Sequence, residues 1–183
     1  MHDDASRWDD RYRSVPPPGP LAPDAVADRA DLVELLPDTG VAIDIACGLG
    51  RQSLWLAQRG LQVVSLDVSP IAIHALRAAA HVAGLADRID ARVIDLDMGL
   101  PIEPTTADVV VCQRFRQPSV YAQIAERLVV GGIAIVTVLS EVGADSPGPF
   151  HAPPGELVSA FDEFDIVDAY EGDGVATIVA RRC

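Results

Sequence analysis

A turn of small residues follows an acidic side chain in the apolar run 41–46, and this pattern predicts a ligand-binding loop. The sequence VAIDIACGLGR places Asp44 near the end of the run and Gly48 and Gly50 in the turn. Glycine permits the positive φ angles of tight turns and lets a ligand approach the backbone closely. The free N–H groups at the start of a following helix can bind that ligand.

Two classes of nucleotide cofactor compete for this turn. A dinucleotide fold uses the pattern G-x-G-x-x-G, and Ser53 stands here at the position of the third glycine. A pyrophosphate prefers positive surroundings, whereas Asp44 lies four residues before Gly48. A carboxylate at that place suits a ligand that carries a sulfonium and an ammonium group. The turn therefore favours S-adenosylmethionine (SAM) over NAD(P).

Further acidic residues follow the next two apolar runs. Asp67 ends the run 62–67, where a carboxylate can accept hydrogen bonds from both hydroxyls of a ribose. Because NAD and SAM share the ribose, Asp67 indicates a nucleoside without choosing between them. Asp95 closes the third run, 90–95, and its carboxylate can accept from an adenine amine. Asp97 is an equally acidic candidate, and the spacing does not separate the two.

The elements that must position these residues alternate along the chain. We expect strands over residues 41–46, 62–67, 90–95, 107–112 and 133–139, and helices over residues 6–13, 24–36, 51–58, 69–83, 120–129 and 155–161. Such alternation predicts a parallel sheet with helices on both faces. The runs 165–170 and 175–181 flank a Gly-Asp-Gly joint, which predicts an antiparallel hairpin. The fold class is therefore α/β, a Rossmann-like three-layer sandwich.

Composition narrows the class of protein. The chain has 183 residues, of which 49% are apolar, and 14 basic against 27 acidic side chains give a net charge of −13. We expect one domain over residues 1–183, with residues 1–23 as an N-terminal lid segment and proline-rich connector. A chain this acidic is not expected to bind nucleic acid or a membrane surface. Without a transmembrane run, a secretory signal or a cysteine pattern for disulfides or zinc, we expect a cytoplasmic protein without a metal.

The quoted segments resemble those of the class I SAM-dependent methyltransferases. The similar stretches are IDIACGLGR, VVSLDVSP, ARVIDLDMGLP, and ADVVVC followed by a helix and VGGIAIVTV. The N-terminal WDDRY resembles the W-x-x-R-Y segment of the small tellurite-resistance-type branch, and PGEL before the final hairpin resembles another of its segments. This resemblance covers the chain from Ala5 onward. It implies a seven-stranded sheet with an antiparallel last strand, in agreement with the hairpin.

The resemblance also implies roles for individual residues. Asp44 and the turn would hold the methionine part of SAM, Asp67 the ribose and Asp95 the adenine, under an N-terminal lid. The implied cofactor contacts are Asp44, Ala46, Gly48, Gly50, Asp67, Val68, Asp95, Leu96, Cys112, Trp8, Arg11 and Tyr12. Two positions depart from the family pattern, because Ala46 replaces the first glycine of D-x-G-x-G-x-G and Arg116 replaces a histidine found in relatives.

The acceptor side of the reaction is less defined. Displacement of a methyl group from a sulfonium requires orientation and the exclusion of water, and a base is needed only when the acceptor carries a proton. Arg114 and Arg116 are candidates to bind a small anionic acceptor, and His151 is the candidate base. Two alternatives stay open, namely a non-catalytic protein that binds SAM or S-adenosylhomocysteine and an NAD(P)-dependent oxidoreductase.

Each assignment also has a purely structural alternative. The glycine turn can serve only tight packing, and Trp8 and Tyr12 can form a hydrophobic cover. Cys112 reads more readily as a small buried apolar residue than as a reactive thiol. The two arginines and His151 can be ordinary surface residues.

Overall fold

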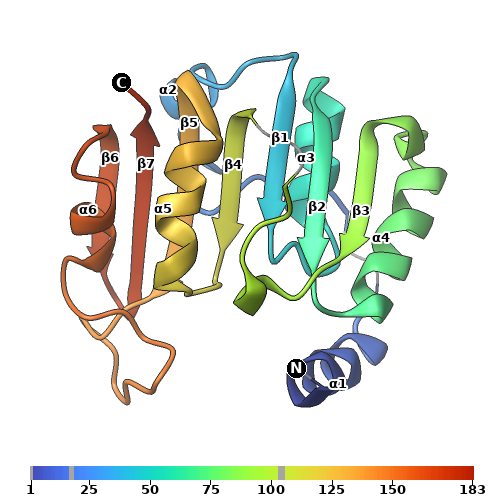
Figure 1. Ribbon diagram of the computed structural model, residues 1–183, viewed down its shortest axis with the longest axis horizontal. Coiled ribbons are helices and arrows are strands. Elements are labelled where there is room, and N and C mark those ends of the chain that lie inside the picture. The colour runs from blue at the N-terminus through green and yellow to red at the C-terminus, as the bar shows by residue number, and fades with distance from the viewer. Residues whose placement is uncertain (1, 17–18, 103–105) are drawn as a thin grey trace.

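Seven strands form a single sheet in the computed structural model, which describes residues 2–16, 19–102 and 106–183. The strand order is β3-β2-β1-β4-β5-β7-β6 (Figure 1). The strands are β1 (Val41–Ile45), β2 (Gln62–Asp67), β3 (Ile89–Val93), β4 (Ala107–Gln113), β5 (Leu128–Leu139), β6 (Asp165–Gly172) and β7 (Val175–Arg181). Strands β1 to β5 pair in parallel, and β7 lies antiparallel to both β5 and β6. The predicted architecture is confirmed.

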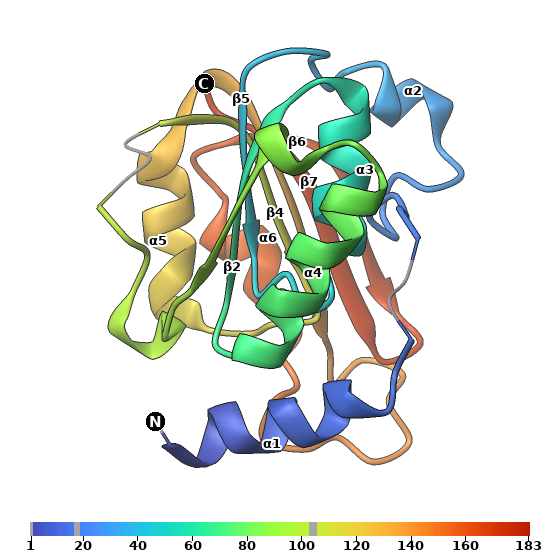
Figure 2. The ribbon, with the colours of Figure 1, turned by 90° about the vertical axis from the view of Figure 1, so that its right-hand side faces the viewer.

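Helices cover both faces of the sheet, as Figure 2 shows from the side. They are α1 (His2–Arg13), α2 (Ala30–Val33), α3 (Arg51–Arg59), α4 (Pro70–Val82), α5 (Pro118–Arg127) and α6 (Glu156–Ala160), with short 3₁₀ turns η1 (Ala86–Arg88) and η2 (Leu96–Met98). Helices α5 and α6 lie on one face, and α2, α3 and α4 on the other. No helix in the described ranges is long and apolar enough to cross a bilayer.

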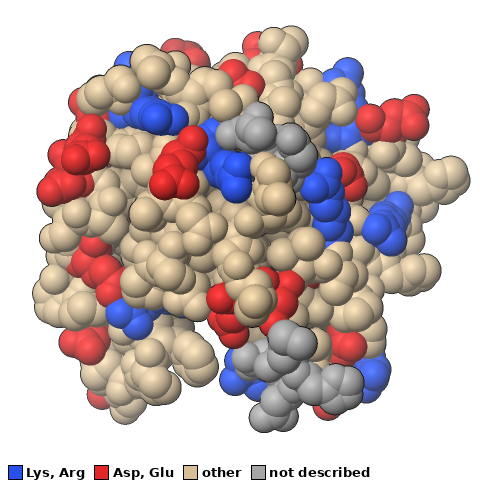
Figure 3. Space-filling model, viewed as in Figure 1, with Lys and Arg blue, Asp and Glu red and all other residues tan. Residues whose placement is uncertain are grey.

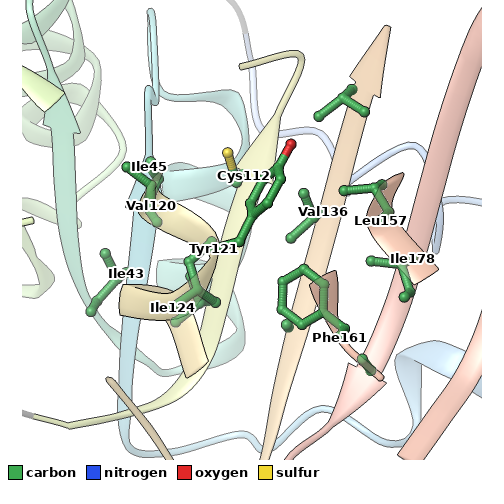
Figure 4. Packing of buried hydrophobic residues seen from close by; sticks show 14 of the residues in the cluster. Ile43, Ile45, Cys112, Val120, Tyr121, Ile124, Val136, Leu157, Phe161 and Ile178 are labelled. Atoms are coloured by element: carbon green, nitrogen blue, oxygen red, sulfur yellow. The ribbon is translucent and has the colours of Figure 1, made fainter. Parts of the chain in front are cut away.

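The core is split by the sheet because the central strands are apolar on both sides. On one face, Ile43 and Val136 pack in one cluster with Tyr121 of α5 and with Phe161, which directly follows α6 (Figure 4). On the other face the alternate strand residues pack against α2 and α3. Burial on both faces fixes the register of each strand, and this determines where the strands end.

Local signals in the sequence set the boundaries of two elements. Ser69 is the N-cap of α4, and its side chain accepts a hydrogen bond from the N–H of Ala72 at 3.1 Å, with Pro70 in the first turn. In the terminal hairpin, Gly172 pairs with Val175, and the residues between them have positive φ. That backbone is the one that a two-residue hairpin turn requires.

Two predicted helices were wrong in extent. In the predicted helix 24–36, only Ala30–Val33 is helical, because Val26 and Arg29 donate their N–H groups three residues back, as in a series of turns. The predicted helix 120–129 runs instead over Pro118–Arg127. Strand β5 begins at Leu128, so the paired glycines that were expected to end the helix lie inside a strand.

The edge of the sheet at which β1 to β4 end carries two covering segments. Helix α1 lies at this edge below β2, β3 and α4, and the loop 140–155 extends from it on the side of β5 and α6 (Figure 1). Figure 3, in the same view, shows the surface notched between the loop and α1. Ligands of open α/β sheets bind at this edge.

Candidate cofactor and acceptor sites

The turn after β1 adopts the backbone that its glycines predict. The φ angles are 53° at Ala46, 53° at Gly48 and 83° at Gly50. A side chain on Gly50 would overlap Leu76 of α4, so glycine is needed here for packing as well as for φ. Ala46 adopts a left-handed conformation that costs a residue with a side chain about 1–2 kcal/mol.

Asp44 lies beneath this turn in a chain of buried hydroxyl groups. Its side chain is only 1% exposed, and its Oδ2 accepts a hydrogen bond of 2.5 Å from Ser53 Oγ. Ser65 Oγ donates in turn to Ser53 Oγ at 2.8 Å. Burial raises the pKa of Asp44 to about 7, with the Ser53 hydrogen bond opposing the rise and the charge of Asp67 adding to it. A cation close to Asp44 would favour its ionised form.

Asp67 ends β2 beside the same turn. Its Oδ2 accepts from the N–H of Gly48 at 2.8 Å, and its Oδ1 from the N–H of Ser69 at 2.9 Å. Each carboxylate oxygen keeps a second lone pair, so the group can still accept from two neighbouring hydroxyls. Burial raises the pKa of Asp67, and the two N–H groups oppose that rise.

Three lid residues of α1 were predicted to cover the cofactor. Tyr12 does lie over the turn, since its hydroxyl is 2.9 Å from where a Cβ on Gly48 would stand. Burial and the charge of Asp67 both raise the pKa of Tyr12. Trp8 stacks on Tyr12 with ring centroids 5.7 Å apart, and the guanidinium of Arg11 lies 5.4 Å from the Trp8 ring centre. The exposed Arg11 therefore acts on the ring stack rather than on the turn.

The predicted adenine contacts cluster after β3. Leu96 is buried, Asp95 is half-buried, and Val68 lies half-buried after β2. Asp95 Oδ1 accepts from the N–H of Asp97 and thereby starts η2, whereas exposed Asp97 accepts from Gln117 Nε2 at 3.0 Å. The assignment of the adenine amine to Asp95 remains a prediction, with Asp97 as its alternative.

Cys112 ends the apolar part of β4 and is buried. Its thiol donates to the carbonyl oxygen of Phe115 at 3.4 Å, and burial raises the thiol's pKa. A thiol that resists ionisation is a poor nucleophile. Its place at the end of β4, next to β1 in the sheet, is the one that the resemblance implies.

The two candidate acceptor arginines are both paired. Arg116 binds Glu156 of α6 through two of its nitrogens, with Nη2 at 2.5 Å from Oε2. Tyr121 donates its hydroxyl to the same carboxylate at 3.0 Å. Arg114, which is exposed and has a φ of 58°, lies 3.3 Å from Asp24. An anionic acceptor at Arg116 would have to compete with Glu156.

His151 lies in the loop 140–155, next to Phe150, whose ring is 5.6 Å from the guanidinium of Arg7 in α1. His151 Nδ1 accepts a hydrogen bond from the N–H of Gly148 at 2.9 Å. The neutral ring must then carry its proton on Nε2. In this state Nε2 of His151 is a hydrogen-bond donor.

Sequence reasoning missed several partners of these residues. Ser53 was considered only as an imperfect third glycine, yet it binds Asp44. Glu156 was quoted only within a family segment, yet it neutralises Arg116. Asp9, in the WDDRY segment, binds Ser69. The last two pairs join parts of the sequence 40 and 60 residues apart, whereas Ser53 is nine residues from Asp44. Only the acidic or hydroxyl character of each residue hinted at these partners.

The donor set fits SAM better than a dinucleotide. The two buried carboxylates are bound by hydroxyl and N–H groups, which are neutral and leave the negative charge of the carboxylates unbalanced. A positively charged ligand would balance that charge. The same carboxylates would repel a pyrophosphate. In the ranges that the structure describes, no three His, Cys, Asp or Glu residues gather to hold a metal ion.

Comparison with known proteins identifies the domain. Residues 42–132, about half of the chain, match the protein-family model described as "Methyltransferase domain". The match runs from β1 to the first part of β5 and includes Asp44, the glycine turn and Asp67. The chain therefore belongs to the SAM-dependent methyltransferases, and its cofactor is SAM.

Solved structures with the same fold have low sequence identity to this chain. TehB from Haemophilus influenzae has a TM-score of 0.73 and 21% identity, with 86% of this chain and 63% of TehB covered. This chain thus spans less than two thirds of TehB. The 4+2 cyclase SpnF has a TM-score of 0.72 and 17% identity over 100% of this chain and 93% of its own. A SAM-dependent methyltransferase from Methanosarcina mazei has a TM-score of 0.64 and 20% identity, with 84% of this chain and 97% of that protein's chain covered.

Proposed function

We propose that this protein transfers the methyl group of SAM to a small-molecule acceptor. The observation that carries the proposal is the pair of buried carboxylates, Asp44 and Asp67, on either side of a glycine turn inside the methyltransferase domain. Bound SAM supplies an electrophilic methyl group on a positively charged sulfur. Asp44 would hold the methionine part, and Asp67 would hold the ribose with the lone pairs that Gly48 and Ser69 leave free.

The acceptor would enter between α1 and the loop 140–155, where the notch lies (Figure 3). These segments would exclude water and orient the nucleophile. Because His151 Nδ1 already holds Gly148, Nε2 would donate a hydrogen bond to an acceptor. The ring would act as the general base only after it released Gly148. We therefore favour an acceptor that is anionic at neutral pH, oriented by His151 and Arg114, with a smaller part for the neutralised Arg116.

Calorimetric titration tests the cofactor. We expect SAM and S-adenosylhomocysteine to bind and NAD not to bind. Asp67→Ala should weaken SAM binding by about 1–3 kcal/mol, or roughly 5- to 150-fold, because the ribose loses a charged acceptor. Asp90→Ala is the matched control, since Asp90 is an exposed carboxylate that pairs with Arg92 in β3. Equal SAM affinity in the Asp67→Ala variant would remove this residue from the site.

Transfer of a radiolabelled methyl group tests the reaction. A panel of thiols, chalcogen oxyanions and phenols covers acceptors with and without a negative charge. Labelling of at least one small acceptor is expected. Binding of SAM without labelling of any panel member would favour the alternative of a non-methylating SAM-binding protein. That alternative has one observation in its favour, because a protein described as a cyclase shares this fold.

A further inference from the structure

Asp9 of helix α1 forms hydrogen bonds with the start of helix α4. Its Oδ1 accepts hydrogen bonds from the hydroxyl of Ser69 and, at 3.4 Å, from the N–H of Ile71. Ser69 is the N-cap of α4, and its oxygen also accepts from Ala72. A carboxylate at this place binds free N–H groups and faces the positive end of the helix dipole. Asp9 thus binds α1 to the start of α4.

The same Ser69 also binds the predicted ribose acceptor. Its backbone N–H donates to Asp67 Oδ1 at 2.9 Å, while its hydroxyl donates to Asp9. Asp9 is also close enough for its charge to contribute to the raised pKa of Asp67. One residue therefore connects α1 with the carboxylate of the cofactor site.

The position of Asp9 on α1 determines what the helix covers. Residues three apart lie on one face of a helix, so Tyr12 and Asp9 face the sheet edge together. Tyr12 lies over Gly48, and Trp8 stacks on Tyr12. Asp10, the next residue, is exposed and pairs within the helix, with Arg13 at 2.5 Å. The two neighbouring aspartates therefore have different environments.

We propose that Asp9 is a positioning residue of the cofactor site, which holds α1 closed over the glycine turn through Ser69. Closure of α1 and occupation of the site then stabilise each other, because the Ser69 that Asp9 binds also fixes Asp67. The identity of the ligand rests on the proposed function, whereas the attachment of α1 by Asp9 does not. Asp9 accepts hydrogen bonds from Ser69 and Ile71, so its link to the turn and to Asp67 runs through Ser69.

Trp8 reports on the position of α1. The chain has two tryptophans, Trp8 and Trp55, so Trp55→Phe leaves Trp8 as the single emitter. In that background without ligand, Asp9→Ala should shift Trp8 emission to longer wavelength and increase its quenching by acrylamide. Tryptic cleavage after Arg11 should become at least fivefold faster. Asp10→Ala, the matched control, should leave the emission maximum unchanged and should keep quenching and the cleavage rate within twofold of the parent.

Ligand binding supplies the second measurement. SAM should bind at least fivefold more weakly to Asp9→Ala, with Asp10→Ala within twofold, and saturating SAM should restore the parent emission of Trp8. Asp9→Asn keeps an accepting oxygen and should rescue part of the loss. Circular dichroism of each variant verifies that the sheet is folded, so that a change at Trp8 reports α1 alone.

The outcomes separate the two proposals. If Trp8 emission and cleavage in Asp9→Ala equal those of the parent, Asp9 does not hold α1, whether or not SAM binds. If the unmutated protein binds no SAM while Asp9→Ala still exposes Trp8, the proposed function fails and the attachment stands. If Asp9→Ala exposes Trp8 but SAM affinity is unchanged, the coupling to the cofactor site is refuted.

Discussion

The two sides of the ligand-binding edge handle charge differently. On the cofactor side, at the ends of β1 and β2, neutral hydroxyl and N–H groups bind Asp44 and Asp67. On the acceptor side, beyond β4, each candidate arginine already has an acidic partner. Buried carboxylates without a cation are costly unless a ligand compensates them. Under the proposed function, the cofactor side would receive a positively charged ligand, and on the acceptor side an acceptor would have to displace an acidic partner of an arginine.

Two glycines with the same backbone conformation test how tightly the cofactor turn packs. Gly50 in the cofactor turn and Gly131 in β5 share a φ of 83°. An added Cβ overlaps Leu76 at Gly50 and meets nothing within 4 Å at Gly131. We expect Gly50→Ala to lower the free energy of unfolding by about 2–4 kcal/mol, from backbone strain plus overpacking.

Gly131→Ala is the control for that experiment, because it introduces the same backbone strain without the overlap. Its expected cost is about 1–2 kcal/mol in urea denaturation. The difference between the two variants measures how tightly the turn packs on α4. Equal costs would mean that α4 shifts to admit the methyl group and that the turn is not tightly held.

The half-buried ion pair on the acceptor side gives the next largest effect. The side chains of Arg116 and Glu156 are 22% and 14% exposed. Glu156→Ala leaves the guanidinium and the Tyr121 hydroxyl without their acceptor, which should cost about 1–3 kcal/mol of unfolding free energy. Asp24→Ala breaks the exposed pair with Arg114 and should change stability by at most about 0.5 kcal/mol. Similar effects for both variants would contradict the idea that Glu156 has a structural role.

The contrast between the two sides also explains what the sequence could predict. Asp44, the glycine turn and Asp67 interact within about two dozen residues, so a strand, a turn and a second strand sufficed to place them. Arg116 and Glu156 are 40 residues apart, and Asp9 and Ser69 are 60 apart. No periodicity marks such partners, because their meeting depends on how α1 and α6 fold back onto the sheet edge.

The bounds of two predicted helices were wrong for a similar reason, although the predicted fold is confirmed. Apolar Val26 and Leu36 are buried, as a helix over 24–36 would require, but a series of turns buries them equally well. The run LVVGG reads as a helix end because glycines commonly stop helices. In the structure its first residue, Leu128, pairs with Ala107, so tertiary pairing overrides the local signal.

The pH dependence of SAM binding tests the uncompensated charge at Asp44. With a pKa of about 7, Asp44 is largely protonated at pH 5.5 in the free protein. A positive ligand needs the ionised form, so SAM affinity should rise by up to about tenfold per pH unit between pH 5.5 and 7. Asp44→Asn should bind more weakly and with a flatter slope in calorimetry over that range. An unaltered slope in the variant would assign the titration to another group.

The same shift affects stability without ligand, and its sign can be worked out. Between pH 4 and 7 the folded Asp44 keeps a proton that the unfolded chain releases, because its folded pKa is raised from 3.8 to about 7. The unfolded state then binds fewer protons, so the contribution of Asp44 to stability falls as pH rises through this window. Asp44→Asn should remove that fall in a comparison of urea midpoints at pH 5 and pH 7.

The smallest expected effect is at Ala46, whose left-handed backbone conformation strains the cofactor turn locally. Ala46→Gly removes strain of about 1–2 kcal/mol, offset by about 0.4–1 kcal/mol of added freedom in the unfolded chain. Ala83→Gly makes the same chemical change at an exposed residue with an ordinary φ of −79°. It should therefore destabilise the protein by up to about 1 kcal/mol. If urea denaturation shows that Ala46→Gly stabilises the protein and Ala83→Gly destabilises it, the alanine in the turn is strained. A loss of stability in both variants would mean that the Ala46 methyl group packs usefully against its surroundings.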